Sequence, residues 1–109
     1  MSSNDALTEQ EFRLASEDAI ADLERHLLPL ADEHDFEVEQ QGGVLQVIFE
    51  EPSPAKFVIS PNAPVRQIWV AAMARGYKLS WSPTAGAFVL DGESLDAMVS
   101  RLINEFLRG

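Results

Sequence analysis

Eight carboxylates gather between residues 17 and 37 of this 109-residue chain. They are Glu17, Asp18, Asp22, Glu24, Asp32, Glu33, Asp35 and Glu37. Like charges held close together repel one another, and a bound cation would relieve that repulsion. Ligand sets made only of oxygen select hard cations such as Fe³⁺, Mg²⁺, Mn²⁺ or Ca²⁺, and they tolerate Fe²⁺. The cluster therefore indicates weak cation binding, and the alternative is a solvated acidic face that only favours solubility.

A second candidate is Gln67 with Trp69, which alternate with Ile68 and Val70. If the two aliphatic residues face a core, strict strand alternation places Gln67 and Trp69 on the open face of a sheet. An exposed tryptophan is suited to anchoring a protein interface. In the alternative, the opposite register would bury Trp69, since Ala71 on the same face is also apolar.

Other catalytic or ligating residues are sparse. The chain has no cysteine, which excludes disulfides, thiolate metal sites and a cysteine nucleophile. His26 and His34 form no metalloprotease-type pair, and we expect structural or solvated roles for them, with His26 on or beside the buried side of a helix. No nucleophile-elbow motif accompanies the serines. We therefore expect no enzymatic activity.

Charge is distributed unevenly along the chain. Residues 1–51 hold 14 acidic residues against two arginines, a net charge of -12, whereas residues 52–109 hold four acids against six bases, a net charge of +2. Such a field repels phosphate backbones and anionic lipid and attracts cations or basic proteins. Nucleic acid is therefore an unsuitable partner.

The acidic cluster requires a helix to carry it. Thr8 with Glu11 is a capping-box signature, and apolar residues follow at three- and four-residue spacing as far as Leu30. Pro29 should kink or end this helix, so we place its end between Leu27 and Ala31. A second helix is predicted after Ser94 as N-cap; its apolar stripe is Leu95, Met98, Val99, Leu102, Ile103, Phe106 and Leu107.

Between the helices the hydrophobic period changes to two. Strands are predicted over 36–39, 45–50, 56–60, 65–71, 77–81 and 87–90, with Gln40 to Gly43 and Pro61 to Pro64 among the connections. Alternating strands need one covered face, and two amphipathic helices are the elements available to cover it. We expect an α+β two-layer sandwich, one domain over residues 1–109, with two helices on one face of a mainly antiparallel sheet of about six strands.

The start of the chain, residues 1–12, carries acids and no base, unlike a secretory signal or a transit peptide. The longest apolar run, Ile68 to Ala74, is far shorter than the roughly 20 residues of a membrane helix. We expect a cytoplasmic protein that does not span a membrane.

The order of these elements resembles the frataxin family of the bacterial CyaY type, over Phe12 to about Phe106. The strongest similarity lies in Gly42 to Leu45, in Phe57 to Ile59, and in Pro64 to Trp69 with its Pro-x-x-Gln-Ile-Trp spacing. Gly76-Tyr77 and the terminal helix match more weakly. The chain departs from the family at Ser60-Pro61-Asn62, at Phe88, where tryptophan is usual, and at the less acidic end of the first helix.

The resemblance implies a protein of iron-sulfur cluster assembly, either an iron-dependent regulator or an iron donor. It implies weak binding of Fe²⁺ or Fe³⁺ by the eight carboxylates, with other hard divalent cations able to substitute. It also implies docking on a cysteine desulfurase and an iron-sulfur scaffold protein through Asn62, Arg66, Gln67 and Trp69. We expect a monomer that can oligomerise with iron. The alternative is an acidic secretion-type chaperone or peptide-binding module, in which metal has no role.

Overall fold

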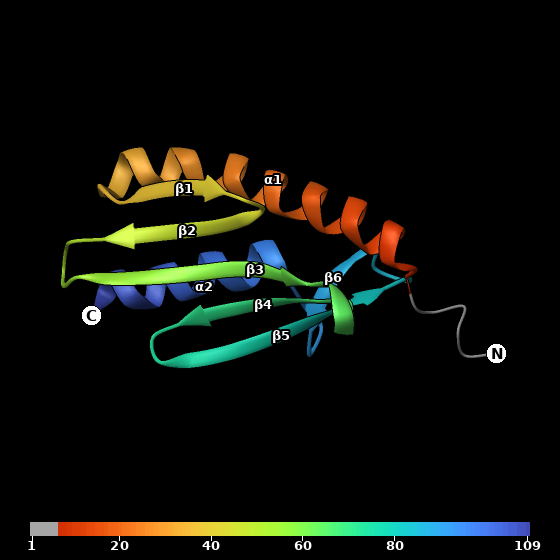
Figure 1. Ribbon diagram of the computed structural model, residues 1–109. Helices are drawn as coiled ribbons and strands as arrows, with labels where there is room; N and C mark the ends of the chain where they lie inside the picture. The colour runs from red at the N-terminus through yellow and green to blue at the C-terminus, as the bar shows by residue number, and fades with distance from the viewer. Residues whose placement is uncertain (1–6) are drawn as a thin grey trace.

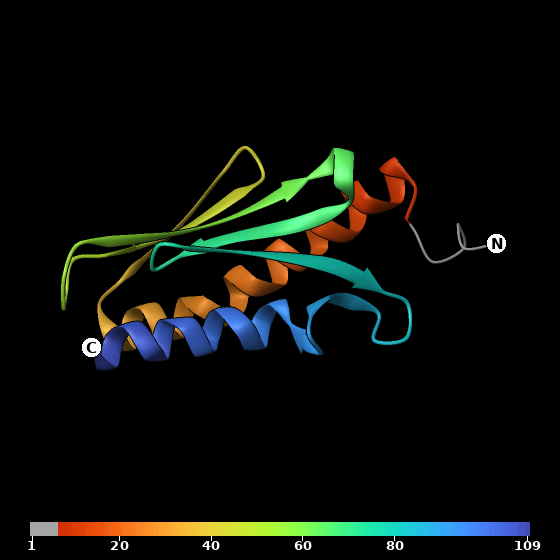
Figure 2. The same cartoon turned by 90° about the horizontal axis from the view of Figure 1, so that it is seen from below.

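Two helices cover one face of a seven-stranded sheet in the computed structural model, which describes residues 7–109 (Figure 1). The elements are α1 (Glu9–His34), β1 (Glu37–Gln41), β2 (Val44–Phe49), β3 (Ala55–Asn62), the 3₁₀ helix η2 (Ala63–Val65), β4 (Gln67–Ala72), β5 (Arg75–Ser82), β6 (Ala87–Leu90), β7 (Glu93–Ser94) and α2 (Leu95–Arg108). Neighbouring strands in the sheet follow chain order and are all antiparallel. Seen from below, both helices lie beneath the sheet (Figure 2). The predicted sandwich is confirmed, and the two-residue β7 adds a strand to the expected six.

The capping box at the start of α1 forms as predicted. Thr8 Oγ1 accepts from the Glu11 amide at 3.1 Å, and Glu11 Oε1 accepts from the Thr8 amide at 2.9 Å. The predicted end between residues 27 and 31 is wrong, because α1 continues through Pro29 to His34. Pro29 is exposed, so water can solvate the carbonyl that its missing N–H leaves free, while Ala31 in the following turn is buried. Asp35 in the left-handed region then ends the helix.

The first hairpin turns at Gly42 and Gly43, both at positive φ, which glycine adopts without steric cost. The predicted loop over 61–64 is partly wrong. β3 extends to Asn62, and its ladder with β4 pairs Pro61 with Ile68. Because β2 starts at Val44, which is opposite residue 60, the last two residues of β3 lie beyond the hairpin. This overhang shapes a groove beside the first half of α1.

The core lies between the helices and the inner face of the sheet. Its largest fully buried side chains are Phe12, Phe49, Phe57, Phe88, Ile20, Leu23, Leu27, Leu45, Ile59, Ile68, Leu79 and Met98. Burying Ile68 and Val70 decides the register of β4, so every other β4 side chain faces away from the helices. On α2 the predicted stripe is buried from Leu95 to Ile103, and Phe106 packs on Phe49 with 4.6 Å between ring centroids.

Within residues 7–109, neither helix is long and apolar enough to cross a membrane.

Candidate functional site

The eight predicted carboxylates, here called the acidic ridge, follow α1 and the start of β1. Seven of the eight are exposed and Glu24 is half-buried. Asp35 caps the helix and Glu37 is the first residue of β1. In the described part of the chain, no three acidic or histidine side chains gather closely enough to hold a metal ion together. The ridge therefore offers single carboxylates and pairs spread along the surface.

The ridge is divided between two flanks of α1. Asp18 and Asp22, one helical turn apart, line a groove of about 320 Å³ between α1, β6 and the start of α2. Glu17 lines a different groove, on the side facing the β1–β2 turn. This division follows from the helical rotation of 100° per residue. A cation at the Asp18 flank would meet different neighbours from one at the Glu17 flank.

Asp96 joins Asp18 and Asp22 at the first flank, which the sequence analysis missed. It lies in the first turn of α2 and lines the same groove, and its Oδ2 is 2.9 Å from His26 Nδ1. His26, expected on or beside the buried side of the helix, is 64% exposed and lies beside that side, where it reaches α2. Only the packing of α1 against α2 brings His26 and Asp96, 70 positions apart in sequence, into contact.

The open face of the sheet carries Trp69 as predicted. Trp69 is 37% exposed, whereas its neighbours Ile68 and Val70 are buried. Its indole Nε1 donates to Gln67 Oε1 at 2.9 Å, and the ammonium of Lys78 lies 5.0 Å from the ring centroid. Gln67 Nε2 in turn donates to Ser80 Oγ at 3.4 Å. Gln67 and Lys78 therefore orient the indole on the open face through one hydrogen bond and one cation–π contact.

The other two predicted partner-binding residues lie at the end of β3 and in the corner after η2. Asn62 pairs with Gln67 across the ladder and is half-buried. Arg66, at positive φ, donates from Nε to the Leu7 carbonyl at 3.2 Å and from Nη1 to the Ala63 carbonyl. These contacts tie the start of α1 to the sheet. Arg66 has a structural role that the sequence did not indicate.

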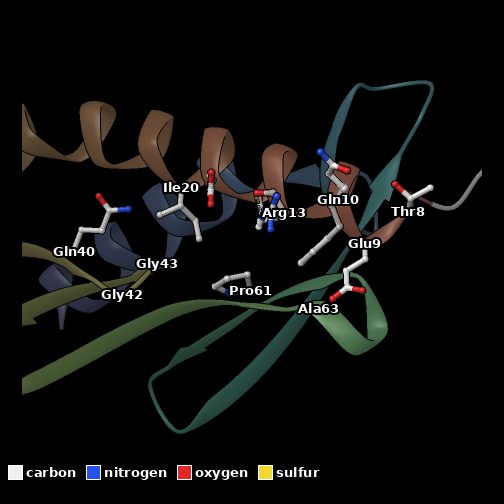
Figure 3. A pocket seen from close by; sticks show the side chains of 13 residues that line it. Thr8, Glu9, Gln10, Arg13, Ile20, Gln40, Gly42, Gly43, Pro61 and Ala63 are labelled. Atoms are coloured by element: carbon white, nitrogen blue, oxygen red, sulfur yellow. Dashed lines mark hydrogen bonds between the residues drawn. The ribbon is translucent and has the colours of Figure 1, made fainter.

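A groove of about 810 Å³ lies beside the first half of α1 (Figure 3). Arg13 and Ile20 line one wall, the turn at Gly42 and Gly43 lies at one end, and Pro61 lies along the strand opposite the helix. It exists because α1 is longer than the hairpin beneath it and passes over the overhanging end of β3. The sequence analysis did not predict it.

Two charged groups of this molecule are held firmly at the β7–α2 junction. Arg101 Nε and Nη2 donate to the two carboxylate oxygens of Glu93, each at 2.9 Å. The hydrogen bond from Arg101 lowers the pKa of Glu93 below its usual value, and it raises the pKa of Arg101 above its own. This pair stabilises the fold locally and lies apart from the acidic ridge in sequence.

The sequence of this chain is similar to those of known proteins. The frataxin-like domain profile matches residues 5–109. The chain belongs to the frataxin family. An iron-sulfur cluster assembly protein CyaY from Janthinobacterium sp. (strain Marseille) is 31% identical over 101 residues, covering 91% of this chain and 89% of that protein. Another protein of that name, from Azotobacter vinelandii, is 31% identical over 104 residues, which cover 92% of this chain and 89% of that protein.

Solved structures agree on the frataxin fold. The structure of a frataxin from Psychromonas ingrahamii superimposes with a TM-score of 0.68 at 19% sequence identity, covering 94% of this chain and 93% of that chain. Because the frataxin profile spans residues 5–109, the acidic ridge, the Trp69 face and the groove of Figure 3 all lie inside the matched region.

Proposed function

We propose that this chain acts in iron-sulfur cluster assembly, as an iron-dependent regulator or iron donor to a cysteine desulfurase and its scaffold protein. The observation that carries the proposal is membership of the frataxin family across the whole described chain, together with relatives named as iron-sulfur cluster assembly proteins. The comparisons give no support to the alternative of a secretion-type chaperone.

Iron is the cargo in this role, and the acidic ridge is its proposed site. The ridge supplies only oxygen ligands, which suit Fe³⁺ and accept Fe²⁺. Its carboxylates are mostly exposed, so a bound ion keeps water in its coordination shell and exchanges readily. Asp18 and Asp22 line the groove that faces α2, and Asp96 of α2 lines the same groove. Weak, exchangeable binding fits sensing or delivery, and it requires no catalytic centre.

Two surfaces of opposite charge serve the partners. The acidic ridge attracts a basic protein surface, whereas the sheet around Trp69 carries Lys78 and presents an aromatic anchor. The two surfaces belong to different elements, α1 and β4–β5. One chain can therefore contact two sides of a partner complex at once, as a monomer.

The test is a titration of the ¹⁵N-labelled protein with Fe²⁺ under anaerobic conditions, followed residue by residue. We expect amide signals of α1 and of residues 32–37 to broaden before any others. Binding should weaken as the pH falls below about 5, because protons compete with iron for the carboxylate oxygens. Light scattering on the same samples should show a monomer without iron. Broadening centred instead on His26, or none at millimolar Fe²⁺, would remove the acidic ridge as the iron site.

Binding to the desulfurase and scaffold is measured separately, by calorimetry with the purified complex from the same genome. We expect measurable affinity in the absence of iron and a change in affinity when Fe²⁺ is added. A protein that binds iron but not this complex would refute the assembly role and leave a metal-binding protein.

A further inference from the structure

A small hollow lies on the open face of the sheet beside Trp69. Its volume is about 200 Å³ and its walls are almost entirely apolar. Val58, Ala71 and Gly76 lie opposite one another on β3, β4 and β5 and form one row, and Ser60, Trp69 and Lys78 form the next. Opposed residues of antiparallel strands share a face, so both rows line the same hollow.

Gly76 creates this space, and the fold gives no reason for glycine there. Gly76 lies inside β5 and is absent from the positive-φ residues. A Cβ built on it would meet no atom within 4 Å. Glycine inside a strand weakens the strand and often marks a place where another molecule approaches closely. Packing within this chain therefore does not explain the glycine, whereas close approach of a partner molecule to this surface would.

The hollow is also accessible from the side. Within the described chain, β6 pairs with β5 only over Ser80 to Ser82, so β5 has no neighbouring strand beside Gly76. The indole of Trp69 forms one rigid wall because Gln67 and Lys78 hold it in place. A cavity of about 150 Å³ lined by apolar groups holds a benzene molecule. The hollow therefore has room for one large apolar side chain.

Charge indicates the surroundings of that side chain. Residues 52–90, which include β3 to β6, contain four bases and no acid. Lys78 borders the hollow itself, while Glu37 and Glu39 lie at the opposite edge of the sheet, on β1. An acidic partner surface is attracted at the β5 edge and repelled at the β1 edge. It would therefore approach from the β5 side.

We propose that this hollow receives one aliphatic side chain projecting from an acidic surface of the partner complex, with Gly76 as the specificity-determining residue. The inference rests on the proposed function and names the chemistry by which its partner is recognised. The side chain lies against the indole of Trp69, and flanking carboxylates meet Lys78.

Gly76→Val tests the hollow because it fills the space without opposing the fold. Valine favours strands and its Cβ meets no atom, so the melting temperature should equal or exceed that of the parent. The affinity of Gly76→Val for the desulfurase and scaffold complex should be lower than that of the parent by tenfold or more. The affinity of Gly76→Ala should lie between those of the parent and of Gly76→Val. Gln41→Val is the matched control, since it adds the same side chain to the open face three strands from Trp69. It should leave affinity unchanged.

A peptide probe tests the hollow without the complex. The capped tripeptide Glu-Leu-Glu, at millimolar concentration, should shift the indole signal of Trp69 and the amides of Ala71, Gly76 and Lys78. The same peptide should shift none of them in Gly76→Val, and Lys-Leu-Lys should bind more weakly to the parent.

The outcomes separate the two proposals. If Gly76→Val binds the complex as tightly as the parent, or if no peptide shifts the Trp69 indole, the hollow is not a receptor, whereas the assembly role stands on the parent's own binding. If the parent fails to bind the complex but the acidic peptide shifts the hollow signals, the receptor stands and the assembly role falls. Equal shifts with both peptides would overturn the acidic character of the partner.

Discussion

The indole Nε1 of Trp69 donates a hydrogen bond of 2.9 Å to Oε1 of Gln67, two residues earlier on the same strand. Residues at this spacing share a face, so the bond lies across the open side of the sheet. It satisfies the only polar group of the indole and leaves the ring's apolar surface to a partner. An interface anchor fixed in this way loses little conformational freedom on binding.

The first prediction separates this surface from the core. Trp69→Ala should cost little stability, well below the roughly 3 to 5 kcal/mol of truncating a buried tryptophan, because the side chain is exposed. Binding to the desulfurase complex should weaken by about 2 kcal/mol. Urea unfolding and calorimetry measure the two effects. Trp81→Ala is the control: Trp81 is half-buried against Phe88, with 5.2 Å between ring centroids, so its loss should lower stability. A Trp69→Ala variant that unfolds as easily as Trp81→Ala would place Trp69 in the core.

The second prediction concerns the acidic ridge. Replacing Asp18, Asp22 and Glu24 by Asn, Asn and Gln should raise the melting temperature or leave it unchanged, since crowded like charges destabilise the folded chain. Surface changes otherwise alter stability by only about 0.5 kcal/mol. The exposed ion pair of Asp22 with Arg25 should contribute little. The same variant should lose Fe²⁺ broadening in the middle of α1, around residues 18–24. A large drop in melting temperature would instead assign these carboxylates a structural role.

Arg66 supports a third prediction, about the start of α1. Arg66→Ala removes the hydrogen bond to the Leu7 carbonyl and should lower the free energy of unfolding by about 1.5 kcal/mol, because bonds from charged donors contribute about 1.5 to 3 kcal/mol. Hydrogen exchange should accelerate most in the first turns of α1. Arg75→Ala, at the exposed start of β5, is the control for loss of one positive charge. If both variants have the same free energy of unfolding, the hydrogen bond from Arg66 to the Leu7 carbonyl does not stabilise the fold.

The fourth prediction is a pH dependence at the β7–α2 junction. The pKa of Glu93 is lowered in the folded protein by the hydrogen bond from Arg101. Its contribution is therefore fully present above the unfolded pKa, near 4.3, and is lost as the pH falls through the folded value. Glu93→Gln should melt below the parent at pH 7, and the difference should shrink at pH 3. Glu50→Gln, at an exposed position after β2, is the control for loss of one negative charge. A difference that stays constant between the two pH values would refute the ionic contribution.

Local rules were sufficient for most of the framework. The capping box of Thr8 and Glu11 marks the start of α1, and Ser94 marks the start of α2, because caps depend on residues within one turn. Alternation along β4 put Trp69 and Ile68 on opposite faces, and the burial of Ile68 under the helices then showed that Trp69 is on the open one. The exposure of the ridge carboxylates also follows from helical periodicity, since it depends only on which side of α1 is apolar.

Pro29 shows where a local rule failed. Sequence propensity predicts a break, but the turn that follows buries Ala31, and this packing outweighs one missing backbone hydrogen bond. Helix propensity contributes less than tertiary burial, so the end of α1 was decided by the core.

The sequence by itself therefore determined most of the elements, the acidic flanks of α1 and the alternation of Trp69 with Ile68, because each depends on a period or a cap within a few residues. Only the tertiary structure decided that Asp96 and His26 meet across two helices, that Arg66 holds Leu7, and that Val58 and Gly76 border one hollow. These residues are 18 to 70 positions apart along the chain. Contacts of that kind depend on strand order and helix packing, and no spacing in the sequence encodes them.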